Sequence, residues 1–323
     1  MDNIENGNYF DWVDFITKTA VQTSHTVSMS GGNNGLVYSS SIGYLSDEGV
    51  VGTEAYERYT ASASLSKKLN KFTIGLKAYL SYSERESGSR ELFRSAYRLP
   101  VTVDPYEDNG DLILYPDEED TRFINPYYEV NGSWKVNQRI LNVISNFYVQ
   151  YEANDWLKLK STFSPNLATT RNGEHRGLLT KAARNDPSRT RAYYGVDWKN
   201  SYTWDNTADF NFDISNDHQL NATLISSVYY QQLEGNNIET RNVPDFSGFY
   251  NTGAGTDIRE YSSYYIKETT ASFAARLNYN FKQKYLLTFT GRYDGASKLA
   301  TGNKWDFFPS AAFAWRASEE PFL

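Results

Sequence analysis

The chain has no cysteine among its 323 residues. That absence excludes disulfides, thiolate catalysis and thiolate metal sites, and it suits an envelope protein that crosses an oxidising space unfolded. Long apolar runs are missing too, because no stretch approaches the roughly 18 residues that a membrane-spanning helix needs. The sequence is therefore not that of a helical membrane protein.

An excess of basic charge is also missing. The net charge is -7, and no basic stripe exists that could displace counterions from phosphates, so nucleic acid is not an expected partner. The stretch after Met1, "DNIENGNYFDW", has neither a basic nor an apolar region of the kind a signal peptide contains. For a chain that otherwise looks exported, we expect a missing front end.

Helical periodicity is nearly absent, with one short candidate turn at 10–20. Aromatic residues are abundant at 16%, and they recur with the period of two that marks β-strands. The alternation predicts eleven strands, near 25–31, 36–45, 58–67, 71–83, 139–152, 156–164, 202–215, 218–232, 268–281, 285–294 and 305–316.

Each predicted strand has one apolar and one polar phase. We expect the apolar phase to face lipid, represented by Phe210, Phe212, Leu224, Phe273, Leu277, Phe289 and Phe313. The opposite phase is expected to face a wet lumen, represented by Lys77, Thr223, Arg276, Asn278, Thr288 and Arg292. A one-residue slip in register would invert a whole strand.

The connections alternate between tight polar turns and long loops. The turns are expected at 31–35, 68–71, 153–155, 216–218 and 282–284, and the loops at 46–57, 84–138, 165–201, 233–267 and 295–304. This sorting is typical of an antiparallel up-and-down outer-membrane β-barrel, and the strands are long enough to cross a bilayer at a tilt. The alternative is a large soluble β-sandwich or propeller with the same alternation.

Aromatic side chains mark many strand ends, where their amphipathic rings suit the lipid headgroup level. We interpret these side chains as membrane girdles. They are Tyr44, Tyr59, Tyr82, Tyr151, Trp156, Tyr202, Trp204, Tyr285, Tyr293 and Trp305.

Four stretches carry a resemblance to a known family. They are "HTVSMSGGNNGLVYSSSIGYLSDEGVV" (25–51), "RLPVTVDPYEDNGDLILYP" (98–116), "INPYYE" (124–129) and "GRYDGASKLATGNKWDFFPSAAFAWRASEEPFL" (291–323). With them the chain resembles SusC/RagA-type TonB-linked outer-membrane transporters over about 10–323. The last block is long and ordered enough to be specific.

The resemblance implies a 22-stranded barrel with an N-terminal plug, and no plug or TonB-box segment precedes Met1. We therefore expect a fragment, with a lead-in segment at 1–24 and a partial barrel at 25–323. About eleven strands of such a wall should form an open curved sheet with edges near 25–31 and 305–316. The chain as given is expected to transport nothing, because an open edge in hydrocarbon leaves backbone groups unpaired.

The long loop at 84–138 holds the first candidate site residues. Tyr106, Tyr115, Tyr127, Tyr128 and Trp134 are candidates for stacking on sugar rings, although packing within the loop explains them equally well. The same loop offers a weak calcium candidate, since hard cations take clustered carboxylates: Asp104, Glu107, Asp108 and Asp111. Its "DNG" at 108–110 is also a hairpin signal, and a solvated hairpin is the simpler interpretation.

The remaining candidates are lumen-facing charges and histidines. Lys77, Arg276, Arg292 and Asp294 fall on the inward phase, where they either line a wet wall or contact a plug. His25, His175 and His218 lie on separate connections, so no catalytic triad or metal cluster is expected, nor any cofactor.

The favoured function is the barrel-wall portion of a non-enzymatic importer. The resemblance implies uptake of oligosaccharides or peptides with a SusD-like surface lipoprotein and the TonB-ExbB-ExbD system, in the outer membrane of a Gram-negative, Bacteroidetes-type cell. The alternatives are a soluble or surface β-rich carbohydrate-binding protein and a small outer-membrane barrel enzyme.

Overall fold

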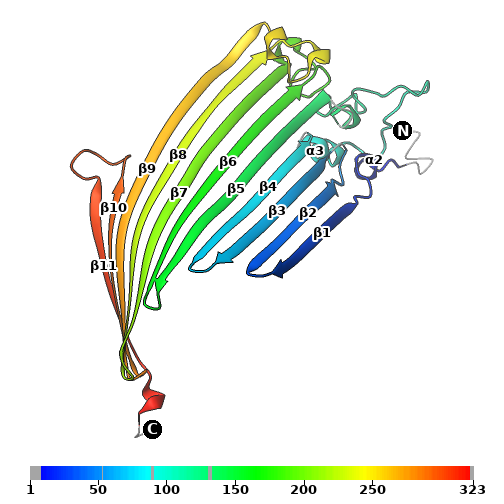
Figure 1. Cartoon of the computed structure of the whole chain (residues 1–323). Coiled ribbons are helices and arrows are strands. Elements are labelled where there is room, and N and C mark those ends of the chain that lie inside the picture. The colour runs from blue at the N-terminus through cyan, green and yellow to red at the C-terminus, as the bar shows by residue number, and fades with distance from the viewer. Residues whose placement is uncertain (1–8, 53, 89–90, 130–132, 321–323) are drawn as a thin grey trace.

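The computed structural model describes residues 9–52, 54–88, 91–129 and 133–320. All eleven predicted strands are present, and they form one antiparallel sheet in which every strand pairs with its neighbours in sequence. The chain is an all-β meander, as the alternation predicted. Figure 1 shows the sheet as one strongly twisted layer, with tight turns along its lower edge and loops along the opposite one.

The strands differ widely in length. They are β1 (Gln22–Asn33), β2 (Leu36–Glu48), β3 (Ala55–Leu69), β4 (Phe72–Ser87), β5 (Trp134–Asn154), β6 (Leu157–Arg176), β7 (Arg191–Ser215), β8 (His218–Arg241), β9 (Asp257–Phe281), β10 (Tyr285–Ala296) and β11 (Trp305–Trp315). The helices are α2 (Trp12–Ile16) and α3 (Glu91–Ala96), with 3-10 turns η2 (Pro187–Arg189), η3 (Asp245–Ser247), η4 (Thr252–Ala254) and η5 (Ala317–Glu319).

The tight turns depend on residues that tolerate a positive φ. Asn34 and Gly35 join β1 to β2 with φ of 49° and 76°. Left-handed backbone matches the right-handed twist of the flanking strands, which is why short hairpins favour Asn and Gly. The turn from β9 to β10 has the same backbone without such residues, since Lys282 and Gln283 have φ of 53° and 56°.

The predicted long loops are shorter than expected. The loops predicted at 165–201 and 233–267 shorten most, because β6 to β9 continue far into these ranges, and those at 46–57, 84–138 and 295–304 lose a few residues at their ends. The prediction was wrong because it relied on an apolar phase, and the upper parts of these strands carry polar residues on both faces. The alternation of short and long connections is confirmed.

A small apolar core lies at the loop edge, next to the first strands. Trp12 and Ile16 of α2 pack with Leu92, Ala96 and other residues of the 88–133 connection. The indole Nε1 of Trp12 donates to the Pro100 carbonyl at 3.0 Å, which ties the N-terminal segment to this connection. Within the described residues, no helix is long and apolar enough to cross a membrane.

The sheet is open. Its order runs from β1 to β11, and no pairing joins these two strands in the described part of the chain. The edges therefore lie where the sequence predicted them. β1 begins at Gln22, three residues inside the expected lead-in segment, and residues 1–8 of that segment lie outside the described residues.

Candidate functional site

The strand register separates two faces of the sheet. Residues opposite each other in an antiparallel pair point to the same face. Phe289 is opposite Leu277 and Leu277 is opposite Ala222. Ala222 is in turn opposite Phe210. All seven residues predicted for the apolar phase share this side, which we call the apolar face.

The predicted polar residues share the other side, the polar face. Thr290 is opposite Arg276, and Arg276 is opposite Thr223. The register therefore places Thr223, Arg276, Asn278, Thr288, Arg292 and Asp294 together. Lys77 belongs to the same face. It is opposite Asn146, whose side-chain amide donates to Ser164 Oγ on the next strand at 2.8 Å. From Ser164 the opposite pairs continue across the sheet to β9: Ser164–Thr203, Thr203–Tyr229 and Tyr229–Thr270. That this face lines a lumen stays a prediction.

Neighbouring polar groups bind one another along this face. The Nε of Arg292 donates to both oxygens of Asp294 at 2.7 Å, and its Nη2 lies 3.3 Å from Ser272 Oγ. The Asn278 side-chain oxygen accepts from Arg276 Nε at 3.2 Å and from Thr288 Oγ1 at 2.9 Å. These contacts link polar side chains of β9 and β10, and they bring no nucleophile next to a base.

Higher on the polar face, near the loops, lies a charge ladder that the sequence did not predict. Arg191 bridges two carboxylates, with Nη1 at 2.8 Å from Glu174 and Nη2 at 2.7 Å from Glu239. Arg176 binds Glu174 at 2.6 Å and stacks over the Trp134 ring at 4.2 Å. The predicted substrate residue Trp134 is therefore covered by a guanidinium.

The loop aromatics divide between separate places. Phe15 brings two of them together, since its ring lies 5.9 Å from Tyr106 and 5.1 Å from Tyr127. The Tyr115 hydroxyl binds Asn185 at 2.9 Å, and the Tyr128 hydroxyl donates to the Leu112 carbonyl at 2.7 Å. The structure thus joins Tyr106 and Tyr127, and leaves Tyr115, Tyr128 and Trp134 with other partners.

The carboxylate-rich loop forms a hairpin turn. Gly110 has a φ of 89° and donates to the Glu107 carbonyl at 2.9 Å, while the Glu107 amide binds the Asp111 carbonyl at 2.8 Å. In the described parts of the chain, no three acidic or histidine side chains gather closely enough to hold a metal ion. The hairpin pairs Glu107 with Asp111 through the backbone, and Asp104, Glu107, Asp108 and Asp111 do not form such a group, so the hairpin interpretation fits the geometry.

The histidines have structural surroundings. His175, near the loop end of β6, is only 5% exposed, and its Nε2 lies 3.8 Å from Asp245. Burial lowers the pKa of His175, and the nearby carboxylate only partly offsets this. His218 binds the Tyr279 hydroxyl at 2.6 Å, and His25 lies on β1.

The connection between β8 and β9 packs against the apolar face beside His175. Phe249 occupies the space over Gly173, where a Cβ would collide with its ring. The Arg171 guanidinium lies 5.2 Å from the Phe249 ring and binds the side chain of Asn137. Asp245 accepts from the Leu178 amide at 2.8 Å, so the loop is held at both ends of its short 3-10 turn.

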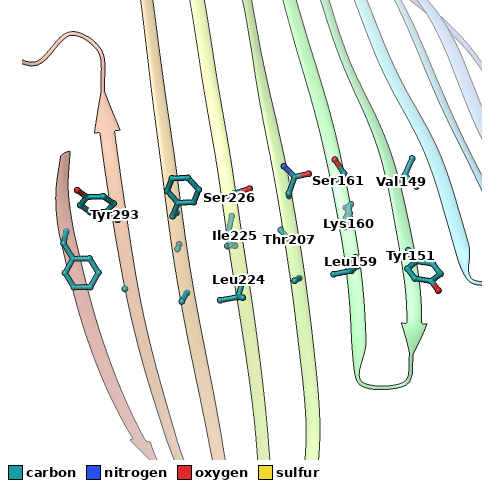
Figure 2. Close-up of a pocket in the computed structure, with 17 residues that line it drawn as sticks. Val149, Tyr151, Leu159, Lys160, Ser161, Thr207, Leu224, Ile225, Ser226 and Tyr293 are labelled. Carbon is teal, nitrogen blue, oxygen red and sulfur yellow. The ribbon is translucent and has the colours of Figure 1, made fainter. Parts of the chain in front are cut away.

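A hollow of about 960 Å³ lies on the apolar face, across β5 to β11. Figure 2 shows its lining on successive strands, with Leu159, Leu224 and Tyr293 among the labelled side chains. Small residues such as Ala275 and Gly291 form its floor. A polar substrate does not suit this hollow, because its walls are apolar.

Comparison with known proteins identifies relatives over almost the whole chain. No family model matches. TonB-dependent receptor P26 of Formosa agariphila is 28% identical over 97% of this chain and 32% of its own length. TonB-dependent receptor SusC of Bacteroides thetaiotaomicron is 28% identical over 97% of this chain and 33% of its own length.

The chain resembles SusC/RagA-type TonB-dependent receptors. The RagAB peptide transporter structure superposes with a TM-score of 0.77 at 21% identity, covering 94% of this chain and 35% of that one. The Escherichia coli outer membrane transporter YddB gives a TM-score of 0.58 at 10% identity. These structural likenesses establish that the sheet shares its fold with part of the barrels in these structures.

The SusC-like chain spans about a third of the length of the curated relatives it matches. The resemblance predicted from the four sequence stretches is confirmed. The relatives are receptors and transporters by name, which agrees with a role other than catalysis.

Proposed function

We propose that this chain is part of the barrel wall of a SusC-like, TonB-dependent importer in the outer membrane of a Bacteroidetes-type bacterium. The observation that carries the proposal is the register, which gathers the predicted apolar residues on one face of the sheet and the predicted polar residues on the other. In a transmembrane barrel the two faces meet lipid and lumen respectively.

In this proposal the apolar face meets lipid. Its aromatic residues form rows near the ends of the strands, as membrane girdles do. Tyr44 and Tyr59 lie 5.0 Å apart and Tyr59 and Tyr82 lie 6.4 Å apart, on three adjacent strands. Nearer the tight turns, Phe72 stacks on Tyr151 at 4.6 Å.

The polar face then lines the lumen, with Lys77, Arg276, Arg292 and Asp294 along the path of a solute. We propose oligosaccharides or peptides as the substrate class, a SusD-like lipoprotein as the surface partner and the TonB-ExbB-ExbD system as the source of energy. Transport is assigned to a closed barrel that contains this wall, because closure pairs the backbone groups of every strand.

The loop aromatics are the proposed contacts for substrate entering from the cell surface. Tyr106 and Tyr127 support this best, since they lie together beside Phe15 and Tyr106 is exposed. Tyr115, Tyr128 and Trp134 are proposed as secondary contacts around the same loop edge. An aromatic face suits the C–H side of a sugar ring or the side chain of a peptide.

The alternatives have less support. A soluble carbohydrate-binding protein would bury one face of such a sheet, yet large apolar side chains stay exposed across it, including Leu224, Phe273 and Phe289. A barrel enzyme needs a nucleophile, a base and an orienting group in contact. The separate surroundings of the histidines do not offer this.

Spin labelling tests the proposal, and the cysteine-free chain makes it direct. Phe289→Cys and Thr288→Cys place a label on the apolar and polar face at adjacent positions. In lipid bicelles we expect the label at 289 to collide with dissolved oxygen and the label at 288 with a water-soluble nickel complex. Leu277→Cys and Asn278→Cys form a second pair on β9. Equal accessibility to the nickel complex at 288 and 289 would refute the proposed membrane placement.

A further inference from the structure

The connection between β8 and β9, residues 242–256, is held against the sheet near the loop ends of β6 and β7. Val243 is 3% exposed, its amide donates to Thr190 Oγ1 at 2.7 Å, and its carbonyl accepts from the same hydroxyl at 2.9 Å. Phe249 is buried over Gly173 of β6. Two separate parts of the connection are therefore anchored, and η3 lies between them.

Asp245, the first residue of η3, reaches back to the end of β6. Its Oδ1 accepts a hydrogen bond from the Leu178 amide at 2.8 Å and lies 3.8 Å from Nε2 of His175. A distance of 3.8 Å is too long for a hydrogen bond, so the Leu178 amide is the donor that satisfies this oxygen. His175 thus lies beside the connection without being hydrogen-bonded to it.

His175 has no acceptor for a second ring proton. The residue is 5% exposed, and in the described part of the chain its Nδ1 is buried without a hydrogen-bond partner. A protonated imidazole donates from both ring nitrogens. The charged form would therefore leave a buried donor unsatisfied, which costs free energy that the same group in water does not lose.

The charges around His175 also oppose a further positive charge. On β5 the opposite residue is Lys135, and on β7 it is Ala192, which is uncharged. Arg171 lies on the same face of β6, four residues earlier, and the connection contributes the carboxylate of Asp245. Burial lowers the pKa of His175, Asp245 offsets part of this shift and Lys135 adds to it.

We propose that His175 is a pH-sensitive latch for the β8–β9 connection. The connection is docked on the sheet while the imidazole is neutral, and it is released when His175 takes up a proton. In the released state water solvates both ring nitrogens, so the released form binds the proton more readily than the docked form. Acid therefore favours release.

The pH dependence of docking follows from this difference in proton affinity. Docking keeps its full stability above about pH 6.5, the ordinary pKa of a histidine in water. As the pH falls below this value, the ratio of released to docked molecules rises by at most about tenfold per pH unit, because a single proton is involved. The rise ends once the docked form is protonated as well.

Release concerns the connection and leaves the strands in place. β8 and β9 pair with each other from the tight turn up to Arg241 and Asp257, so their pairing does not depend on the connection. Local opening of a surface segment requires less free energy than global unfolding. The latch therefore changes the mobility of the connection at a pH at which the sheet stays folded.

The latch responds to the medium outside the cell if the proposed membrane placement holds. From Leu157 to His175, β6 rises about 59 Å, or about 42 Å of depth at a tilt of about 45°, whereas the apolar band is about 25 Å tall. His175 therefore lies beyond the hydrocarbon. This step rests on the proposed function, whereas the latch itself rests on contacts within the chain.

Spin labelling of the full chain in detergent micelles tests the inference. Phe246→Cys places a label on η3 at a side chain that is 93% exposed, in a chain without other cysteines. Thr288→Cys, in a separate sample, places a label on β10 of the sheet. Between about pH 8 and about pH 5, the range in which an imidazole changes charge, we expect the mobile fraction of the label at 246 to rise about twofold or more and the label at 288 to stay unchanged.

His175→Gln is the decisive variant, because glutamine has no proton to gain in this range. The label at 246 should then show the same mobility at both pH values. His218→Gln is the matched control, since His218 lies at a tight turn, bonded to the Tyr279 hydroxyl, and its loss should leave the response intact.

Two further variants keep the test valid if His175→Gln does not fold. Lys135→Gln removes a repelling cation, so the docked form takes up the proton more easily and the acid-induced release should be smaller. Asp245→Asn removes the attracting carboxylate and keeps an oxygen for the Leu178 amide, so the release should be larger. Opposite responses of these two variants support the latch, and responses in the same direction contradict it.

A pH response that persists in His175→Gln would overturn the inference, as would equal mobility of the label at 246 at both pH values in the otherwise unchanged chain. Simultaneous mobilisation of the label at 288 would show that acid unfolds the sheet instead of releasing the connection. None of these measurements depends on which face meets lipid, so failure of the latch is distinguishable from failure of the proposed membrane placement.

Discussion

Leu224 gives the sharpest test of which face meets lipid. It lies on the apolar face of β8, opposite Ala275, and its side chain is 50% exposed. From the tight turn at His218 to Leu224 the strand rises about 20 Å, or about 14 Å of depth at a tilt of about 45°. The apolar band of a membrane barrel is about 25 Å tall, so Leu224 sits near its middle.

Leu224→Arg should therefore lower the free energy of unfolding by about 2–4 kcal/mol, the cost of a guanidinium at the midplane on the lipid face of a barrel. In micelles, which are thinner and wetter than a bilayer, the lower end of that range is expected. The measurement is equilibrium unfolding in urea, followed by tryptophan fluorescence.

Ile225→Arg is the matched control. Ile225 is the next residue along β8 and points to the polar face, opposite Ala274. A guanidinium there remains in water, and the expected loss is below about 1 kcal/mol. If Ile225→Arg is the costly variant and Leu224→Arg is tolerated, the assignment of lipid and lumen is inverted and the reasoning fails.

Three further predictions concern packing and pH. A Cβ on Gly75 would collide with the Tyr148 ring, so Gly75→Ala should cost about 1–3 kcal/mol in urea unfolding, and adding Tyr148→Ser should recover part of it. Phe249→Ala should release the β8–β9 connection to limited proteolysis, whereas Phe246→Ala should not, because these rings are 6% and 93% exposed. Burial holds the pKa of His175 below its ordinary value, so the unfolded chain binds more protons than the folded one below about pH 6.5. The melting temperature should therefore fall as the pH drops through this range, and it should depend less on pH in His175→Gln.

Much of the fold could be predicted from local sequence signals. Period-two alternation gave all eleven strands, and residues such as Asn34 and Gly35 marked the tight turns by their tolerance of positive φ. Since every strand pairs with its sequence neighbour, these short-range signals also determined the topology. The division into an apolar and a polar phase followed directly, because register fixes the face of each side chain.

The site was predicted less completely. Tyr106 and Tyr127 are brought together by Phe15, which lies far earlier in the sequence than either, and nothing local indicates that contact. The ladder through Arg191 joins Glu174 and Glu239 across three strands, and a charged residue alone does not reveal its partner. Asp104, Glu107, Asp108 and Asp111 looked gathered in sequence, yet no three acidic side chains come close enough to hold a metal ion in the described residues.

The sequence by itself determined the strands, their order and the two faces, because each depends on residues that are close along the chain. Only the tertiary structure decided how far the strands extend past the apolar band, since polar residues there stay in the sheet through backbone pairing with neighbours. It also decided that the pairing of β10 with β9 ends at Thr270 while β9 continues, which leaves the edge from Ile258 to Lys267 open. That edge results from the unequal lengths of two neighbouring strands, because β9 pairs with β8 as far as Asp257 whereas β10 pairs with β9 only as far as Thr270.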